Sequence, residues 1–140
     1  MRYRRGMPKL PTPALGYVLL YVPDVGRAVA FWQRAFGLEV GFAHDSGTYT
    51  EMATGLTALG FVDEKLAETN TGPYRKNRPD GDPAGIEVAL TTPEVEAAYA
   101  HALAAGATAV KAPVTKPWGQ VVSYVRDPDG ILVELCSPMS

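Results

Sequence analysis

The sequence of 140 residues lacks the features that identify several large classes of protein. A single cysteine, Cys136, allows no disulfide within the chain, which excludes a disulfide-stapled scaffold and is typical of a reducing compartment. No apolar stretch approaches the roughly 20 residues of a membrane-spanning helix. Thirteen Lys and Arg against fifteen Asp and Glu give a net charge of -2, whereas nucleic-acid-binding domains are usually basic. We therefore expect a cytoplasmic protein that binds neither nucleic acid nor a membrane.

Several catalytic motifs are also missing. The glycine-rich loops that cradle phosphates, the His-Glu-x-x-His zinc motif and the Gly-x-Ser-x-Gly nucleophile turn do not occur. The two histidines, His44 and His101, fall at a strand end and off the apolar face of a predicted helix, so we assign both to the surface. Imidazole ligands, which Zn, Fe and Ni sites favour, are thus not expected. We assign Cys136 to a buried, unreactive position.

The composition is that of a globular domain, with 46% apolar and 20% charged residues. Residues 1–14 contain three prolines and no hydrophobic periodicity, and they are predicted to form a flexible leader. A β-branched and aromatic run over 17–22 then predicts a strand. Behind the N-capping Asp24, apolar residues recur at helical spacing until Gly37 ends the predicted helix. Three further predicted strands cover 38–43, 48–52 and 56–62.

The same order of predicted elements is repeated after a polar linker over 64–84. A strand over 87–90 precedes a helix capped by Thr92, whose apolar face repeats that of the first helix at an ungapped offset of 70. The matching positions are Val25, Ala28, Val29, Trp32 and Phe36 in the first helix and Val95, Ala98, Tyr99, Ala102 and Gly106 in the second. Three more strands are predicted over 108–111, 120–126 and 131–136. Neither unit buries enough surface alone, so the two should share a core or enclose a cavity between their sheets.

This repeat resembles the vicinal oxygen chelate superfamily, which includes glyoxalase I, extradiol dioxygenases and the fosfomycin- and bleomycin-resistance proteins. The residues that carry the resemblance are 17–24, 27–32 and 37–38 at the start, and 118–120 with 126–135 at the end. The resemblance implies an α+β fold in which two βαβββ modules form a cup-shaped mixed sheet with a central cavity, usually as a homodimer. It implies a single domain over 15–137, with modules over 15–63 and 85–137.

In metal-using members of this family, ligands come from the first and last strands of each module. Carried over by position, these sites fall on Tyr17, Glu87, Glu134 and either Gly60 or Leu59. Only the two glutamates are ordinary ligands for a divalent ion, and a neutral phenol is a poor one. We therefore expect no cofactor, and Glu87 and Glu134 as ligands of a weakly held divalent metal only if a metal is bound.

Strand alternation places Glu87, Leu132 and Glu134 on the cup face of the second module, and Tyr17, Leu19 and Tyr21 on that of the first. Two neighbouring carboxylates do not both ionise cheaply, so Glu87 and Glu134 are a candidate acid–base pair. Tyr17 would donate a hydrogen bond to a substrate oxygen. The alternatives are a pair that is solvated or bound to an arginine such as Arg126.

Two further features have a ligand-binding and a structural interpretation. Trp118, expected at the mouth of the cup, either stacks on a planar ligand or covers a core edge or a dimer contact. The linker over 64–84 either folds over the cup as a lid that brings positive charge or is a solvated loop. Its candidate lid residues are Tyr74, Arg75, Lys76 and Arg78.

The leading hypothesis is a glyoxalase/bleomycin-resistance-like small-molecule-binding protein or acid–base enzyme that needs no tightly bound metal. Its predicted catalytic residues are Glu134, Glu87 and Tyr17, and its predicted ligand-binding residues are Trp118, Tyr21, Leu19, Gly60 and Leu132. The alternative is a metal-dependent lyase or isomerase resembling glyoxalase I, with an incomplete ligand set. A third possibility is an interaction module with a vestigial cup. The sequence names no substrate.

Overall fold

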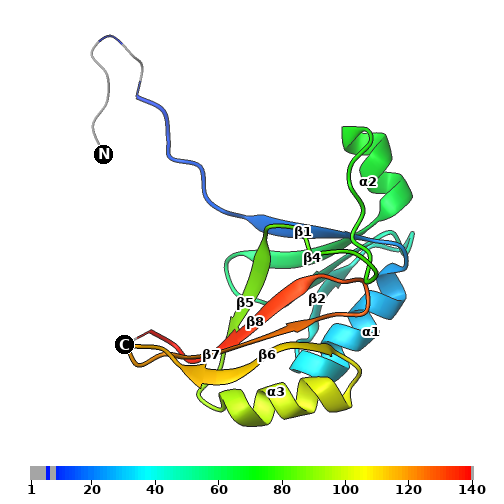
Figure 1. Ribbon diagram of the computed structural model, residues 1–140. Helices are drawn as coiled ribbons and strands as arrows, with labels where there is room; N and C mark the ends of the chain where they lie inside the picture. Colours follow the sequence, from blue (N-terminus) through cyan, green and yellow to red (C-terminus); the bar gives the residue numbers. More distant parts are fainter. Residues whose placement is uncertain (1–5, 7–8, 140) are drawn as a thin grey trace.

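The computed structural model describes Gly6 and residues 9–139, and it contains two four-stranded sheets and three helices (Figure 1). The first half of the chain holds β1 (Tyr17–Val22), α1 (Val25–Phe36), β2 (Val40–Ala43), β3 (Tyr49–Met52), β4 (Ala58–Asp63) and α2 (Glu64–Thr71). The second half holds β5 (Glu87–Thr91), α3 (Val95–Ala104), β6 (Thr108–Thr115), β7 (Val121–Arg126) and β8 (Leu132–Cys136).

The two sheets have the same topology. Their strand orders are β1-β4-β3-β2 and β5-β8-β7-β6. In each sheet the first and last strands of the unit pair in parallel, and the remaining neighbours pair antiparallel. A parallel pair needs a crossover connection, and the helix after the first strand provides it. The prediction of an α+β fold with two βαβββ modules is confirmed.

The caps of α1 follow the sequence prediction. Asp24 accepts a hydrogen bond from the backbone N–H of Arg27 at 3.0 Å, and Gly37 ends the helix with a φ of 72°. In the second module the helix begins later than predicted, at Val95. The hydroxyl of Thr92 still accepts from the backbone N–H of Glu94 at 3.1 Å, so Thr92 orders the turn that enters the helix.

The linker is more ordered than its composition indicates, because its first part is the helix α2. Asp63 caps α2 by accepting from the backbone N–H groups of Lys65 and Leu66. The sequence showed no apolar period here, since the only buried residues of this helix are Glu64 and Ala67. Arg78 holds the helix from the following segment through two hydrogen bonds of 2.6 and 2.9 Å to the Glu64 carboxylate.

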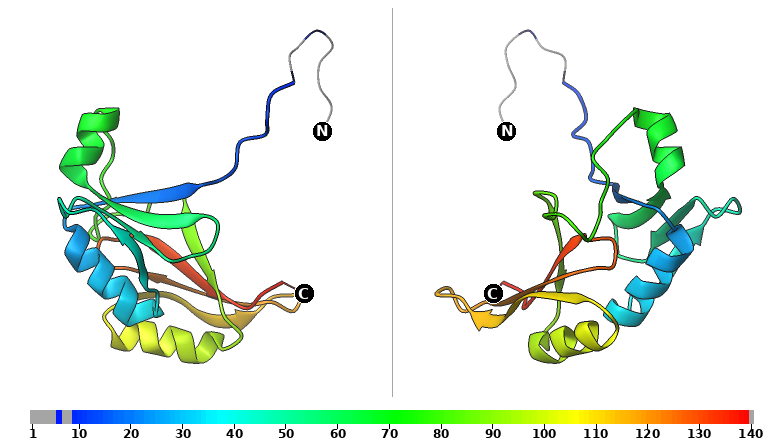
Figure 2. Two further views of the ribbon diagram at one scale, coloured as in Figure 1. Left: turned by 180° about the vertical axis from the view of Figure 1, so that it is seen from behind. Right: turned by 45° about the vertical axis from the view of Figure 1, so that its right-hand side comes forward.

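The two modules share one core on the helix side of both sheets. Helices α1 and α3 lie side by side in all three views (Figures 1 and 2). The core draws side chains from α1, α3 and both sheets, and its fully buried centre includes Trp32, Phe61, Ala102, Val125 and Val133. Even-numbered residues of β1, such as Leu20 and Val22, point into this core. Tyr17 and Leu19 therefore lie on the opposite face of the sheet.

Buried carboxylates tie α1 to the turn between β7 and β8. Asp127 accepts hydrogen bonds from Trp32 Nε1 at 3.0 Å and from the backbone N–H groups of Asp129 and Ile131, each at 2.9 Å. Asp129 forms an ion pair of 2.7 Å with Arg27. Burial raises the pKa of both carboxyls, while these hydrogen bonds and the Arg27 charge oppose the rise. The predicted turn at 127–130 is thus also a joint between the modules.

Residues 9–16 precede β1 without helix or strand and extend away from the body (Figure 1). The rest of the predicted leader, apart from Gly6, lies outside the described residues. No helix in the described part of the chain is long and apolar enough to span a membrane.

Candidate functional site

The face of each sheet that points away from the helices, here called its open face, carries the predicted site residues. On the second sheet, Glu134 of β8 lies between Ala89 of β5 and Tyr124 of β7 in the strand register. Glu87 pairs with Leu132, one step along the same face. The structure therefore brings Glu87 and Glu134 together, as the register of the repeat predicts.

The two carboxyls interact directly. The hydrogen bond to Glu134, with burial and the negative charge of Glu134 adding to it, raises the pKa of Glu87 to about 7. Because like charges at such short range do not ionise together, the pair holds one proton near neutral pH. Burial, followed by the charges of Glu134 and Glu87, also raises the pKa of the half-buried Tyr124. The arrangement supplies a proton donor, a proton acceptor and a neutral phenol at one place.

No arginine neutralises this pair in the described structure. Arg126, the partner considered from the sequence, donates instead to the carbonyl oxygens of Gly130 at 2.9 Å and Arg78 at 3.1 Å. Cys136 lies next to the pair but is buried, with its Sγ 3.9 Å from the carbonyl oxygen of Leu90. Burial, and then Glu134, raise the pKa of this thiol to about 11, so it stays protonated at neutral pH.

The open face of the first sheet is aromatic. In the strand register, Gly60 of β4 lies between Leu19 of β1 and Glu51 of β3. Of the two candidate positions on the fourth strand, Gly60 is therefore the one on the open face, and Leu59 is buried on the helix side. The Tyr49 hydroxyl donates a hydrogen bond of 2.7 Å to Glu51, and burial with this contact raises the pKa of Tyr49 to about 12. Tyr17 is near enough to contribute to that rise.

The position of Gly60 leaves no room for a side chain. A Cβ built on it would lie 2.8 Å from Cδ2 of Leu19 and 3.4 Å from the Tyr49 hydroxyl oxygen. Its missing side chain therefore makes room for Tyr49 and Leu19. The sequence alone does not show which side chains of β3 lie on the open face, and it did not point to Tyr124. Because Thr50 and Met52 are buried on the helix side, the open face of β3 carries Tyr49 and Glu51.

The two open faces do not meet within one chain. No hydrogen bond or ion pair joins the open-face side chains of one sheet to those of the other in the described part of the structure, because the modules pack through their helix sides. Tyr17, Leu19, Tyr21 and Gly60 thus lie on one sheet and Glu87, Leu132 and Glu134 on the other. The grouping of Tyr17 with the glutamates stays a prediction that requires a second chain.

Trp118 lies in the turn between β6 and β7, where its Nε1 donates to Gln120 at 3.0 Å and its side chain is 62% exposed. This turn is at the Cys136 end of the second sheet, whereas Glu87 is at the Leu132 end. Trp118 is therefore not a neighbour of the carboxyl pair within the chain.

The linker reaches the first open face. The Tyr74 ring packs edge-on against Tyr21 with 5.0 Å between centroids, and Asn77 donates to the Tyr21 carbonyl oxygen. The positive charges of the predicted lid are largely paired, Arg78 with Glu64 and Lys76 with Glu68 at 3.5 Å. The linker thus borders the aromatic face without presenting concentrated charge to the glutamates.

The residues at the predicted metal positions do not fit a divalent ion. No group of three or more His, Cys, Asp or Glu residues able to hold a metal occurs among the described residues. Glu87 and Glu134 are the only carboxylates at these four positions, Tyr17 is a phenol and Gly60 has no side-chain donor, so the ligand set is incomplete. Both histidines are exposed, and their ring nitrogens contact Ser46 and the Arg34 carbonyl oxygen.

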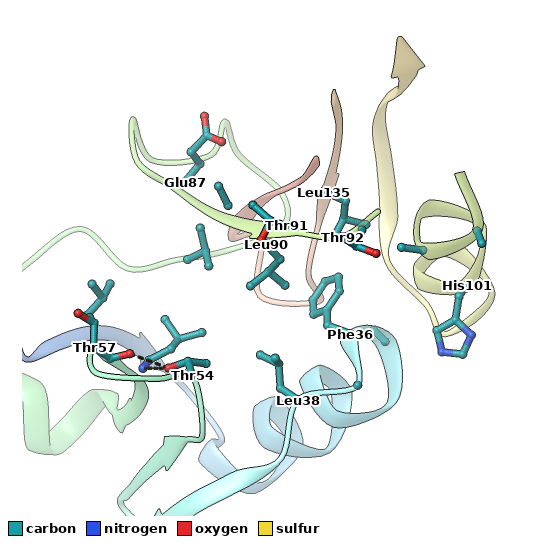
Figure 3. A pocket seen from close by; sticks show the side chains of 18 residues that line it. Phe36, Leu38, Thr54, Thr57, Glu87, Leu90, Thr91, Thr92, His101 and Leu135 are labelled. Atoms are coloured by element: carbon teal, nitrogen blue, oxygen red, sulfur yellow. Dashed lines mark hydrogen bonds between the residues drawn. The ribbon is translucent and has the colours of Figure 1, made fainter. Parts of the chain in front are cut away.

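A cavity of about 850 Å³ lies between the modules and beside the edge strand β5 (Figure 3). Phe36 and Leu38 line it from the first module, and Leu90 and Leu135 from the second. Glu87 is at its rim, with its carboxylate pointing away from Phe36 (Figure 3).

Comparison with known proteins agrees with this architecture. The structure resembles a glyoxalase-related enzyme from Fulvimarina pelagi, with a TM-score of 0.78, 19% sequence identity and coverage of 91% of this chain and 89% of that chain. A glyoxalase/bleomycin resistance protein/dioxygenase family enzyme from Burkholderia phytofirmans gives a TM-score of 0.74 at 23% identity, covering 89% of this chain and 98% of that one.

A superfamily member from Sphaerobacter thermophilus gives a TM-score of 0.67 at 22% identity, covering 91% and 98% of the two chains. At these identities the likeness concerns the fold. No curated protein matches the sequence. A family model matches residues 14–135, nearly the whole chain. The chain belongs to the Glyoxalase/Bleomycin resistance protein/Dioxygenase superfamily.

Proposed function

We propose that this chain is a small-molecule-binding protein of its superfamily whose Glu87–Glu134 pair binds, and exchanges a proton with, an oxygen-bearing ligand without a tightly bound metal. The observation that carries the proposal is the direct contact of two carboxyls on an open sheet face with Tyr124 beside them. Members of this superfamily bind small-molecule ligands. Fold alone does not choose among their chemistries, so the proposal rests on this site.

The chemistry follows from the single shared proton. The protonated carboxyl donates a hydrogen bond to a carbonyl or hydroxyl oxygen, while the ionised one accepts a proton from the ligand. An acid and a base at the same place suit proton transfer next to a carbonyl group. Such a step is that of a lyase or isomerase, and in a protein that only binds, the same pair orients the ligand.

We further propose that a second copy of the chain completes the site as a homodimer. On the first open face, Tyr17, Leu19 and Phe42 are 60%, 41% and 50% exposed, although a sheet face of this composition is ordinarily covered. Among the residues aligned with the glutamates in the register of the other sheet, Tyr124 alone is aromatic. Placing the first sheet of one copy over the second sheet of another would give both faces a partner and bring Tyr17, Leu19, Tyr21 and Gly60 to the glutamates.

Ligand binding is tested by thermal shift with small 2-oxo and 2-hydroxy acids and planar aromatic compounds, at about pH 6 and pH 8. A ligand of the pair should stabilise the wild-type protein. Glu134→Gln should remove most of this effect, whereas Glu96→Gln, which changes an exposed glutamate of α3, should retain it. Equal stabilisation of the wild type and Glu134→Gln would refute the role of the pair.

The dimer is tested separately by light scattering coupled to size-exclusion chromatography. We expect two chains per particle for the wild type and one for Leu19→Arg, because the new charge would lie in the covered face. Glu96→Lys, a charge change on an exposed residue of α3 on the helix side, is the control. A wild-type monomer at about 100 μM would refute the shared site and leave the carboxyl pair to be judged by its own test.

A further inference from the structure

The cavity between the modules is lined by helix-side residues of both modules, and Glu87, Ala89 and Thr91 border it from the open-face side of the edge strand β5. Its walls are mainly apolar and include Phe36, Leu38, Leu59, Leu90, Ala98 and Leu135. Its volume of about 850 Å³ lies in the range of small-molecule sites, about 300–1,000 Å³. The cavity therefore meets the carboxyl pair only at Glu87 on its rim, and its apolar interior needs its own explanation.

The internal repeat explains why the space exists. At the junction of α1 with the turn between β7 and β8, Arg27 and Trp32 fill the gap and bond to Asp129 and Asp127. At the equivalent junction of α3 with the turn between β3 and β4, the offset of 70 puts Ala97 and Ala102 in their places. Ala97 lines the cavity in place of the Arg27 side chain, whereas Ala102 is fully buried in the core, so the second junction stays open on the Ala97 side.

Several polar side chains in the wall already have partners within the protein. Thr54 Oγ1 donates to the Thr57 carbonyl oxygen at 2.8 Å and accepts from the Leu59 N–H at 2.9 Å. Thr57 Oγ1 donates to the Leu15 carbonyl oxygen at 2.6 Å, and His101 Nε2 contacts the Arg34 carbonyl oxygen at 2.8 Å. A ligand in the cavity meets few unpaired donors or acceptors, so hydrophobic contact has to supply its affinity.

The geometry points to a second ligand site, between the modules, for an uncharged apolar molecule of one to three rings or an equivalent hydrocarbon chain. The site borders the Glu87–Glu134 pair through Glu87 alone, and its ligand contacts α1 and β4 of one module and α3, β5 and β8 of the other. Binding there stabilises the joint between the modules, because the ligand is held only while both walls are in place.

The probe for this site is N-phenyl-1-naphthylamine, a neutral dye whose fluorescence rises in apolar surroundings. Titrated into the full chain, it should bind saturably with one molecule per chain. Ala98→Leu and Ala98→Phe project progressively larger side chains from α3 into the cavity. We expect binding to weaken in that order, by about tenfold or more for Ala98→Phe. The control is Phe42→Ser, which removes an exposed apolar residue of β2 and should leave the affinity unchanged.

A second measurement does not depend on variants. In methyl NMR spectra of the wild-type chain, the probe should shift the resonances of Leu38 and Leu90, which line the cavity, and leave Leu19 on the open face unmoved. No saturable binding, undiminished affinity in a folded Ala98→Phe protein, or shifts at Leu19 without shifts at Leu90 would each overturn the proposal. Glu134→Gln should retain the probe, so this result and the test of the carboxyl pair are independent.

Discussion

Replacing Glu134 with Gln tests the physical basis of the site directly, because Glu134 is the main cause of the unusual protonation of Glu87. The pKa of Glu87 stands at about 7, against an ordinary value of 4.5. Gln keeps the shape of the side chain but removes the negative charge, and its amide N–H groups stabilise an ionised neighbour. The pKa of Glu87 should therefore fall back toward its ordinary value.

The change is large enough to measure at a single pH. At about pH 6, a carboxyl with a pKa near 7 is roughly nine-tenths protonated, whereas one with its ordinary pKa is almost fully ionised. The assay is a carbon-13 NMR titration of the side-chain carboxyl groups, with Glu87 assigned through Glu87→Gln. Glu51→Gln is the matched control, since it makes the same replacement on the other sheet, and it should leave Glu87 unchanged.

The raised pKa of Glu87 also makes the stability of the fold depend on pH. A carboxyl whose pKa is higher in the folded state stabilises the fold below its unfolded value, and this contribution is lost as pH rises through the folded value. The wild-type protein should therefore lose stability relative to Glu87→Gln between about pH 5 and pH 8. Because Glu87 is exposed, solvent screening limits the difference to about 1 kcal/mol or less. Titration of Glu87 below pH 5 in the wild type, or at the same pH in Glu134→Gln, would refute the reasoning.

Three further predictions concern the joint between the modules and the core. Asp127→Ala leaves three buried N–H donors, that of Trp32 among them, without their acceptor and should cost about 3 kcal/mol or more in a urea titration. Gly130→Ala should also destabilise strongly, since Gly130 has a φ of 88° and a Cβ there would clash with the Arg78 carbonyl; Gly81→Ala, with open space around it, is the control. Cys136 should resist thiol reagents at about pH 8 until the protein unfolds; fast labelling of the native protein would contradict its burial and raised pKa.

Much of the fold could be predicted from the sequence because it depends on local interactions. The cap at Asp24 and the stop at Gly37 act within a few residues, so the bounds of the first helix followed directly. The repeat then aligned the second module with the first, and strand alternation placed Glu87 and Glu134 on one face. The helix α2 escaped prediction because its stability comes from the Asp63 cap and the contact of Glu64 with Arg78, and not from an apolar stripe.

By itself, the sequence determined two βαβββ modules, the side chains that share a face on β1, β5 and β8, and the pairing of the two glutamates, because each depends on local periodicity and on the repeat. Only the tertiary structure decided which faces the modules bury together. Alternation separates the two faces of a sheet but does not say what covers either of them. The contacts of Trp32 with Asp127 and of Arg27 with Asp129 join residues about 100 positions apart and draw the helix sides together. They leave Tyr17 and Glu87 on separate faces, and small residues in α3 leave the cavity between the modules.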